Sequence, residues 1–184
     1  LKMDFMGLRN LTVLDDAVKL GQRSDPTFTL SSISDDDPKV FQMLSEGKTS
    51  GVFQMESPGM TGVCVGLKPQ NIEDITAIIA LYRPGPMDSI PRFIACKHDP
   101  KLIRYKHPAL IPILSVTYGC IVYQEQVIEI FRKLGGYSLG QADMVRRAIS
   151  KKKKAQIEKE RHSFIHGDPE RGIPGCVANG IPAQ

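Results

Sequence analysis

Three stretches of this chain of 184 residues carry side chains that could act on phosphate groups. The first holds Lys2 and Asp4, in a segment from Leu1 to Phe5 with the alternating pattern of a strand end. Alternate positions of a strand project to one face, so the two side chains would lie side by side. A carboxylate there could hold a metal ion, although two-metal phosphoryl transfer needs several carboxylates. A simple surface ion pair is the alternative interpretation.

The second stretch contains Asp143, Arg146 and Arg147, which fall within a sector of about 100° on a helical wheel. Two adjacent guanidinium groups can bind several phosphate oxygens at once through their planar sets of donors. The alternative is an ion pair between Asp143 and Arg147 on a solvated face, which would contribute only about 0.3–0.5 kcal/mol.

The third stretch is a run of four lysines, Lys151, Lys152, Lys153 and Lys154. Such a run suits contact with a nucleic-acid backbone that does not depend on sequence, and a merely solubilising role is the alternative. Residues 101–184 carry fourteen Lys and Arg against seven Asp and Glu, whereas residues 1–60 carry six against nine. The basic half indicates an anionic partner, such as nucleic acid or a polyphosphate, unless its lysines are only solvated.

Several classes of protein are excluded or disfavoured by the sequence. It contains no apolar run long enough for a membrane-spanning helix, and no glycine-rich loop with the Lys-Ser/Thr pair of a nucleotide-binding P-loop. The four cysteines form no Cys-x-x-Cys pair, so we expect buried thiols in a reducing, cytoplasmic compartment. His162 and His166 are spaced to share one face of a helix, but no third metal ligand is near them in sequence.

The elements that would position these residues are mainly helices, so the sequence predicts a mainly α fold with a few short strands. Helices are predicted from apolar spacing, caps and stop residues over 8–21, 37–47, 69–82, 124–135, 138–149 and from 151 to about 167. Strands are predicted at 1–5 and 51–55, and a short strand or extended entry at 119–123. Residues 87–117 are rich in proline and give no clear pattern, and residues 168–184 are rich in Gly and Pro, so we expect weak order there.

Six segments follow one another in a recognisable order: Leu1–Leu8, Gly51–Met60, Leu81–Pro86, Tyr118–Gln126, Gln141–Ala148 and Lys151–Lys154. In order and spacing they resemble motifs of the alpha subunits of bacterial DNA polymerase III, the C-family replicative polymerases. The resemblance covers nearly the whole chain, and six ordered motifs are far more specific than any one of them.

The resemblance implies an architecture. Residues 1–20 would be the end of the palm, a strand and a helix, and residues 21–36 a linker. Residues 37–167 would form the helical fingers domain, and residues 168–184 its Gly- and Pro-rich continuation.

The resemblance also implies roles for individual residues. Asp4 would be the third carboxylate of the catalytic palm, which helps to hold the Mg²⁺ ions, and Lys2 the palm lysine near the incoming triphosphate. Arg146 and Arg147 would reach that triphosphate from the fingers. Further nucleotide-pocket residues implied by the motifs are Tyr123, Gln124, Arg83, Gln54 and Ser57, and the lysine run Lys151–Lys154 would lie near the nucleic acid.

The function that the resemblance implies is DNA-directed DNA polymerisation, in which deoxynucleotides are added to a primer 3′ end by two-metal nucleotidyl transfer. The implied partners are primer–template DNA, a deoxynucleoside triphosphate and other replicase subunits, without a membrane. The family's two other palm carboxylates precede the Asp4 motif, and a further nucleotide-pocket motif follows the position of Gln184. Because neither is in this chain, we expect a fragment that is inactive alone.

Two other functions fit the same residues. The chain could be a non-catalytic nucleic-acid-binding helical module, in which Arg146, Arg147 and Lys151–Lys154 contact the backbone and Asp4 is incidental. It could also be a protein-interaction domain whose basic face binds an acidic partner. A polymerase depends on nucleoside triphosphate and Mg²⁺, a binding module shows salt-sensitive DNA binding without nucleotide dependence, and an interaction domain shows neither.

Overall fold

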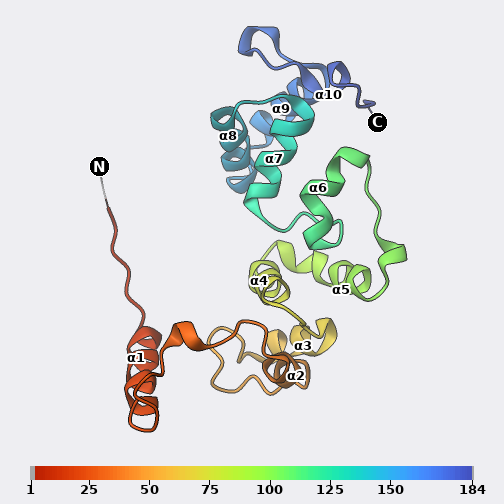
Figure 1. Cartoon of the computed structure of the whole chain (residues 1–184). Coiled ribbons are helices and arrows are strands. Elements are labelled where there is room, and N and C mark those ends of the chain that lie inside the picture. Colours follow the sequence, from red (N-terminus) through yellow and green to blue (C-terminus); the bar gives the residue numbers. More distant parts are fainter. Residues whose placement is uncertain (1–2, 184) are drawn as a thin grey trace. The chain divides into compact units, whose positions relative to one another are not determined.

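The computed structural model describes residues 3–183, which are mainly helical, as predicted (Figure 1). The chain divides into two compact units, residues 1–75 and residues 76–184. The helices of the first unit are α1 (Arg9–Gly21), α2 (Pro38–Ser45), α3 (Pro58–Leu67) and the start of α4 (Ile72–Leu81). The second unit holds the rest of α4, then α5 (Ile90–His98), α6 (Ile111–Leu114), α7 (Gln124–Gly135), α8 (Leu139–Ser150), α9 (Lys154–His166) and α10 (Gly175–Ala178).

The predicted strands do not form in the part of the chain that the structure describes. Residues 51–55 make turns, because Gly51 and Gln54 have φ angles of +76° and +64° that an extended strand cannot contain. Residues 119–123 are an unpaired entry to α7, and residues 3–5 join no ladder. Over residues 3–183 the β pairing is limited to one isolated bridge between Asp168 and Ile173.

Helix starts follow the caps that the sequence predicts. Asp37 accepts a hydrogen bond from the backbone N–H of Lys39 at 2.9 Å, with Pro38 at the first position of α2. Ser138 and Gln141 form the predicted capping box of α8: Ser138 Oγ accepts from the Gln141 N–H at 3.3 Å, and Gln141 Oε1 accepts from the Ser138 N–H at 2.9 Å.

The first unit is built on the packing of α2 against α3. Its core contains Phe41 and Leu44 of α2 with Met60, Cys64 and Leu67 of α3. The hydroxyls of Thr49 and Thr61 meet at 2.7 Å beside this core. Helix α1 contributes no buried residue.

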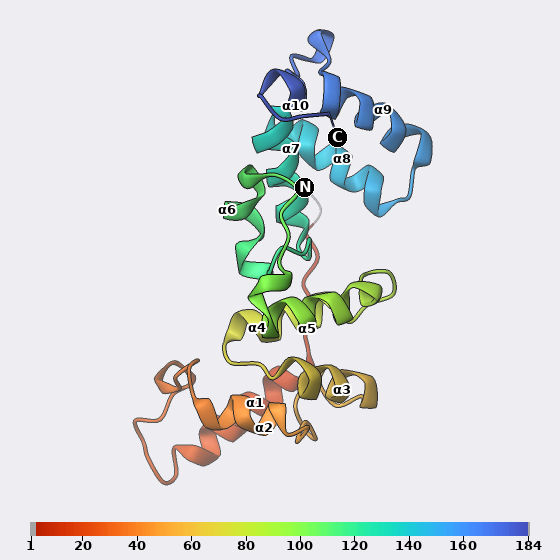
Figure 2. The ribbon, with the colours of Figure 1, turned by 90° about the vertical axis from the view of Figure 1, so that its right-hand side faces the viewer.

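The second unit is built on α7, α8, α9 and α10, which pack on one another (Figure 2). Its core cluster consists of Tyr137, Ala142, Val145 and Ile173, with Ile128, Phe131 and Phe164 packed against it. The Phe131 ring lies 5.2 Å from the Tyr137 ring in an edge-on arrangement and 4.6 Å from the Phe164 ring. This cluster fixes α8 on α7.

Residues 168–183 are more ordered than their composition predicts. Ile173 and Cys176 are buried, and Asn179 Nδ2 donates to the Leu134 carbonyl at 2.8 Å. One glycine of this segment, Gly175, serves close packing. A Cβ on Gly175 would lie 2.3 Å from the backbone nitrogen of Gly167, so this crossing requires glycine.

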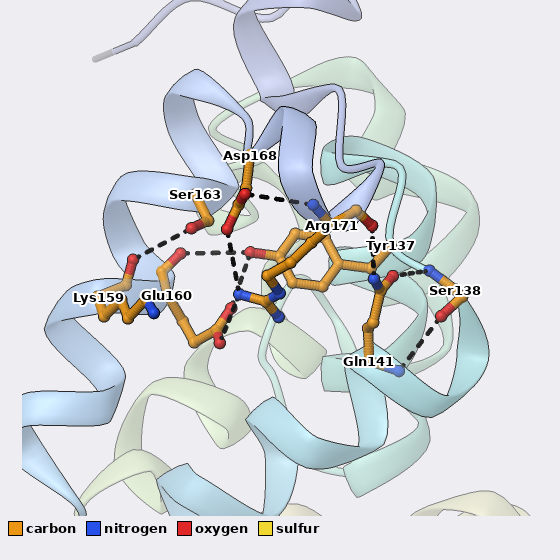
Figure 3. Close-up of polar contacts among 8 residues, drawn as sticks. All are labelled: Tyr137, Ser138, Gln141, Lys159, Glu160, Ser163, Asp168 and Arg171. Atoms are coloured by element: carbon orange, nitrogen blue, oxygen red, sulfur yellow. Dashed lines mark hydrogen bonds and ion pairs between the residues drawn. The ribbon is translucent and has the colours of Figure 1, made fainter.

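A polar network joins this segment to α8 and α9 (Figure 3). The Tyr137 hydroxyl donates to Glu160 Oε2 at 3.1 Å, and Arg171 Nη1 lies 2.9 Å from Glu160 Oε1. Gln141 Nε2 donates to the Arg171 carbonyl at 2.9 Å. The network therefore ties the start of α8 and the middle of α9 to residues beyond α9.

Tyr137 makes the stability of the second unit depend on pH. Burial raises the pKa of Tyr137 well above its ordinary value of 10.0, and the negative charge of Glu160 adds to the rise. A raised pKa means that the folded protein holds this proton after the unfolded chain has lost it, so the free energy of unfolding falls as the pH rises above 10.0. Tyr137→Phe should cost about 1 kcal/mol at neutral pH and flatten this alkaline fall. Urea titrations at pH 8 to 11 measure both effects, and an equally steep fall in both proteins would contradict the assignment.

Candidate functional site

Asp143 binds both arginines of α8. Arg146 Nε donates to Asp143 Oδ1 at 2.8 Å, and Arg147 Nε lies 2.7 Å from Asp143 Oδ2. The hydrogen bond from Arg146 lowers the pKa of Asp143 below its ordinary value, and the charges of both arginines act in the same direction. The side chain thus stays ionised at neutral pH and sets the positions of two cations at once.

The two arginines differ in exposure and in partners. Arg146 is 20% exposed and Arg147 is 66% exposed. Arg146 Nη1 also donates to Gln124 Oε1 at 2.9 Å, which links α8 to the first residue of α7. Arg146 is therefore a fixed donor between two helices, whereas Arg147 is largely in solvent and is bound through Asp143.

The start of α7 is itself held by a buried side chain. Gln126 Oε1 accepts hydrogen bonds from the backbone N–H groups of Val122 and Tyr123, at 2.8 and 2.9 Å. Tyr123 precedes α7 with extended backbone angles and is half-buried. Of the sequence-predicted pocket residues, Gln124 thus contacts Arg146, and Tyr123 directly precedes Gln124 in the chain.

The four lysines form the turn between α8 and α9, and all are exposed. Lys151 follows the last turn of α8, where its N–H bonds to the Arg147 carbonyl at 3.0 Å. Lys154 begins α9, whose first turn has no acidic residue. The positive end of the α9 dipole therefore adds to the lysine charges instead of being neutralised.

The segment from residue 143 to residue 154 has a strongly positive charge. Over residues 143–154, six cationic side chains accompany one carboxylate, Asp143. A fixed guanidinium, an exposed guanidinium and an exposed lysine turn suit an anion with several phosphate groups.

Comparison with known proteins identifies the chain. The family model of the bacterial DNA polymerase III alpha subunit finger domain matches residues 10–172. The chain belongs to this family. The finger-domain match covers α7, α8, α9 and the lysine turn, and it begins inside α1, in the segment that the sequence assigned to the palm.

Curated relatives agree with this identification. The chain is 51% identical over 182 residues to the DNA polymerase III subunit alpha of Bacillus subtilis. This alignment covers 98% of this chain and 16% of the relative. The corresponding subunit of Borreliella burgdorferi is 47% identical over 180 residues, covering 98% of this chain and 16% of the relative. The subunit of Thermus aquaticus is 47% identical over 185 residues, covering 97% of this chain and 15% of the relative. This finger domain thus spans about a sixth of the length of these relatives.

The other sequence-predicted pocket residues belong to other segments of the chain. Gln54 and Ser57 belong to the first unit, where Gln54 occupies a left-handed turn and Ser57 caps α3 by accepting from the Met60 N–H at 3.3 Å. Arg83 is exposed in the second unit, just after α4. Ser57 therefore has a clear role in local structure, as the cap of α3.

Asp4 is exposed in the stretch before α1, outside any helix. Lys2 lies outside the described residues. Within residues 3–183, no group of three or more His, Cys, Asp and Glu is arranged to hold a metal ion. The described residues therefore do not build a magnesium site by themselves.

The remaining sequence expectations concern cysteines, histidines and membranes. The four cysteines are free and buried, as expected. The rings of His162 and His166 lie 5.0 Å apart on α9 but belong to no metal-binding group among the described residues. Across the same part of the chain, no helix combines the length and apolarity needed to cross a bilayer.

Proposed function

We propose that this finger domain works in a DNA-directed DNA polymerase that adds deoxynucleotides to a primer 3′ end. The observation that carries the proposal is the placement of Arg146, fixed between Asp143 and Gln124 beside the exposed Arg147. The match of nearly the whole chain to bacterial DNA polymerase III alpha subunits supports it.

The arginine pair would bind the incoming deoxynucleoside triphosphate. Phosphoryl transfer depends mainly on positioning and on neutralising charge around the phosphates. Because Asp143 and Gln124 already order the Arg146 side chain, its binding to phosphate would cost little further side-chain entropy. Arg147 pairs with Asp143 before the nucleotide arrives, and the triphosphate oxygens would then compete with that carboxylate. Tyr123 and Gln124 would border the same pocket, and Arg83, Gln54 and Ser57 would contribute to it only through the motifs that contain them.

Asp4 and Lys2 would act from the palm, which we place at residues 1–20, before a linker at 21–36 and the fingers from residue 37. Asp4 would join carboxylates from elsewhere in the polymerase in holding Mg²⁺, which supplies charge for the phosphate oxygens. Lys2 would lie near the triphosphate. We further propose that the isolated domain is inactive, and that the polymerase works with other replicase subunits in the bacterial cytoplasm.

Primer extension tests this function directly. A full-length alpha subunit carrying this finger domain should extend a primer only when deoxynucleoside triphosphates and Mg²⁺ are both present. The domain alone, residues 1–184, should give no extension at any nucleotide concentration. Extension by the isolated domain, or binding of DNA without any nucleotide-dependent synthesis by the full-length protein, would contradict the proposal.

The lysine turn should supply contacts to the DNA backbone. Replacing Lys151–Lys154 by alanine in the full-length polymerase should reduce the slope of log Kobs for primer–template binding against log salt by about 0.9 for each lost phosphate contact, and so by about 2–4 in total. Fluorescence anisotropy at several salt concentrations measures this slope.

A matched variant controls for net charge. Four exposed lysines of the first unit, changed to alanine together, remove the same charge far from the turn in sequence: Lys19, Lys39, Lys48 and Lys68. This variant should keep the larger part of the salt slope. If both variants change the slope equally, the lysine turn makes no special contact with DNA.

A further inference from the structure

A buried polar network holds the start of α7. Gln126 is 5% exposed and Thr117 is 0% exposed. While Gln126 Oε1 accepts from the N–H groups of Val122 and Tyr123, its Nε2 donates to Thr117 Oγ1 at 2.8 Å and to the Ile113 carbonyl at 3.2 Å. Every polar atom of this amide is therefore used.

Thr117 connects Gln126 to the loop before α7. Its hydroxyl donates to the Cys120 carbonyl at 2.6 Å, across a turn in which Tyr118 and Gly119 have φ angles of +52° and +79°. Because the hydroxyl accepts from Gln126 and donates to Cys120, it joins both ends of the turn to α7. The backbone from residue 117 to residue 123 is thus held at several points by two side chains.

The chemistry of the neighbours requires an amide at position 126. Val122 and Tyr123 present only N–H donors, whereas the Ile113 carbonyl only accepts. A glutamate would satisfy the donors and repel the carbonyl, and a leucine would leave all of these buried groups unpaired. Gln126 and Thr117 are both buried, so this amide acts through the backbone that it holds and not by touching a ligand.

We propose that Gln126 and Thr117 are positioning residues for the nucleotide pocket. They hold Tyr123 and Gln124 at the start of α7, and Gln124 in turn orients Arg146. The inference rests on the proposed role of Arg146 in triphosphate binding. It predicts that loss of the network weakens nucleotide binding without lowering the affinity for primer–template DNA.

Two isosteric variants of the full-length polymerase separate positioning from stability. Thr117→Val removes the bonds that its hydroxyl makes with Gln126 and with the Cys120 carbonyl, and Thr49→Val removes the part-buried Thr49–Thr61 contact of the first unit. Both should lower the thermal stability, Thr117→Val by more. Only Thr117→Val should raise the KM for the incoming nucleotide, by about tenfold, with kcat changed by less than about twofold. Thr117→Ser keeps the hydroxyl and should restore the wild-type KM.

A double variant tests the route through Gln124. If the network acts by orienting this residue, Thr117→Val should add little to the KM of Gln124→Ala, because the two changes remove one connected interaction. Equal KM increases in Thr117→Val and Thr49→Val, or no increase in Thr117→Val while Arg146→Ala raises KM, would overturn the positioning role. A normal KM in Arg146→Ala would instead overturn the proposed function, and this inference with it.

Discussion

Asp4→Asn should abolish primer extension by the full-length polymerase while primer–template binding remains. The substitution keeps the size and polarity of the side chain and removes one negative charge. If Asp4 is a metal-holding carboxylate, its loss removes several kcal/mol of stabilisation from the transition state, which corresponds to a rate at least about 10³-fold lower. Single-nucleotide incorporation under saturating DNA and nucleotide measures the effect.

Asp16 provides a control for this prediction. It is an exposed aspartate of α1 whose carboxylate lies 3.9 Å from Lys19 Nζ, in an ion pair of the kind that contributes little. Asp16→Asn should extend primers at the wild-type rate. Normal extension by Asp4→Asn would make Asp4 a surface residue, and a nucleic-acid-binding module would then be the better description of this chain.

Replacing Arg146 or Arg147 by alanine should mainly raise the nucleotide concentration that the polymerase needs. Arg146→Ala should have the larger effect, lowering kcat/KM for nucleotide by about 10²–10³-fold, because the charge-assisted bonds of a preorganised guanidinium are lost. Arg147→Ala should cost about tenfold less than that, since Arg147 is mostly exposed and must be ordered on binding. Steady-state kinetics with a single nucleotide distinguish the two.

Arg146→Lys refines this prediction. Lysine keeps the positive charge but cannot bond to Asp143 and Gln124 through separate nitrogens of one planar group, as Arg146 does. It should therefore recover only part of the lost kcat/KM. Full recovery by lysine would mean that charge alone matters and that the bridge between α7 and α8 has no functional role.

The parts of this fold that can be predicted are those whose sequence signals act between residues close together in the chain. The caps at Asp37 and Ser138 are readable because the capping residue and the N–H groups that it accepts from lie within three residues of each other. Helix α3 is hidden because its sequence contains three glycines, which lower helix propensity, and because its stability comes from packing on α2. The strand predicted at 51–55 fails because left-handed turn residues interrupt its alternating pattern.

The candidate site divides in the same way. The arginine pair and its ion pair with Asp143 follow from helical spacing. The bond from Arg146 to Gln124 joins residues 22 positions apart, and it depends on how α7 and α8 pack, which no local pattern encodes. The role of Gln126 is equally hidden, because a buried amide looks the same in sequence as an exposed one. The ordered segment after α9 depends on the close approach of Gly167 to Gly175, again a tertiary contact.

The most direct test of this account is the apparent Kd of the incoming nucleotide, taken from single-turnover incorporation by the polymerase already bound to primer–template DNA. The variant Arg146→Ala/Arg147→Ala should show an apparent Kd raised at least about 10²-fold, with its DNA affinity near that of the wild type. The control Arg132→Ala/Arg161→Ala, which removes two exposed arginines of α7 and α9, should keep the wild-type value. An unchanged nucleotide Kd in the first variant, with weakened DNA binding instead, would contradict the triphosphate role of the arginine pair.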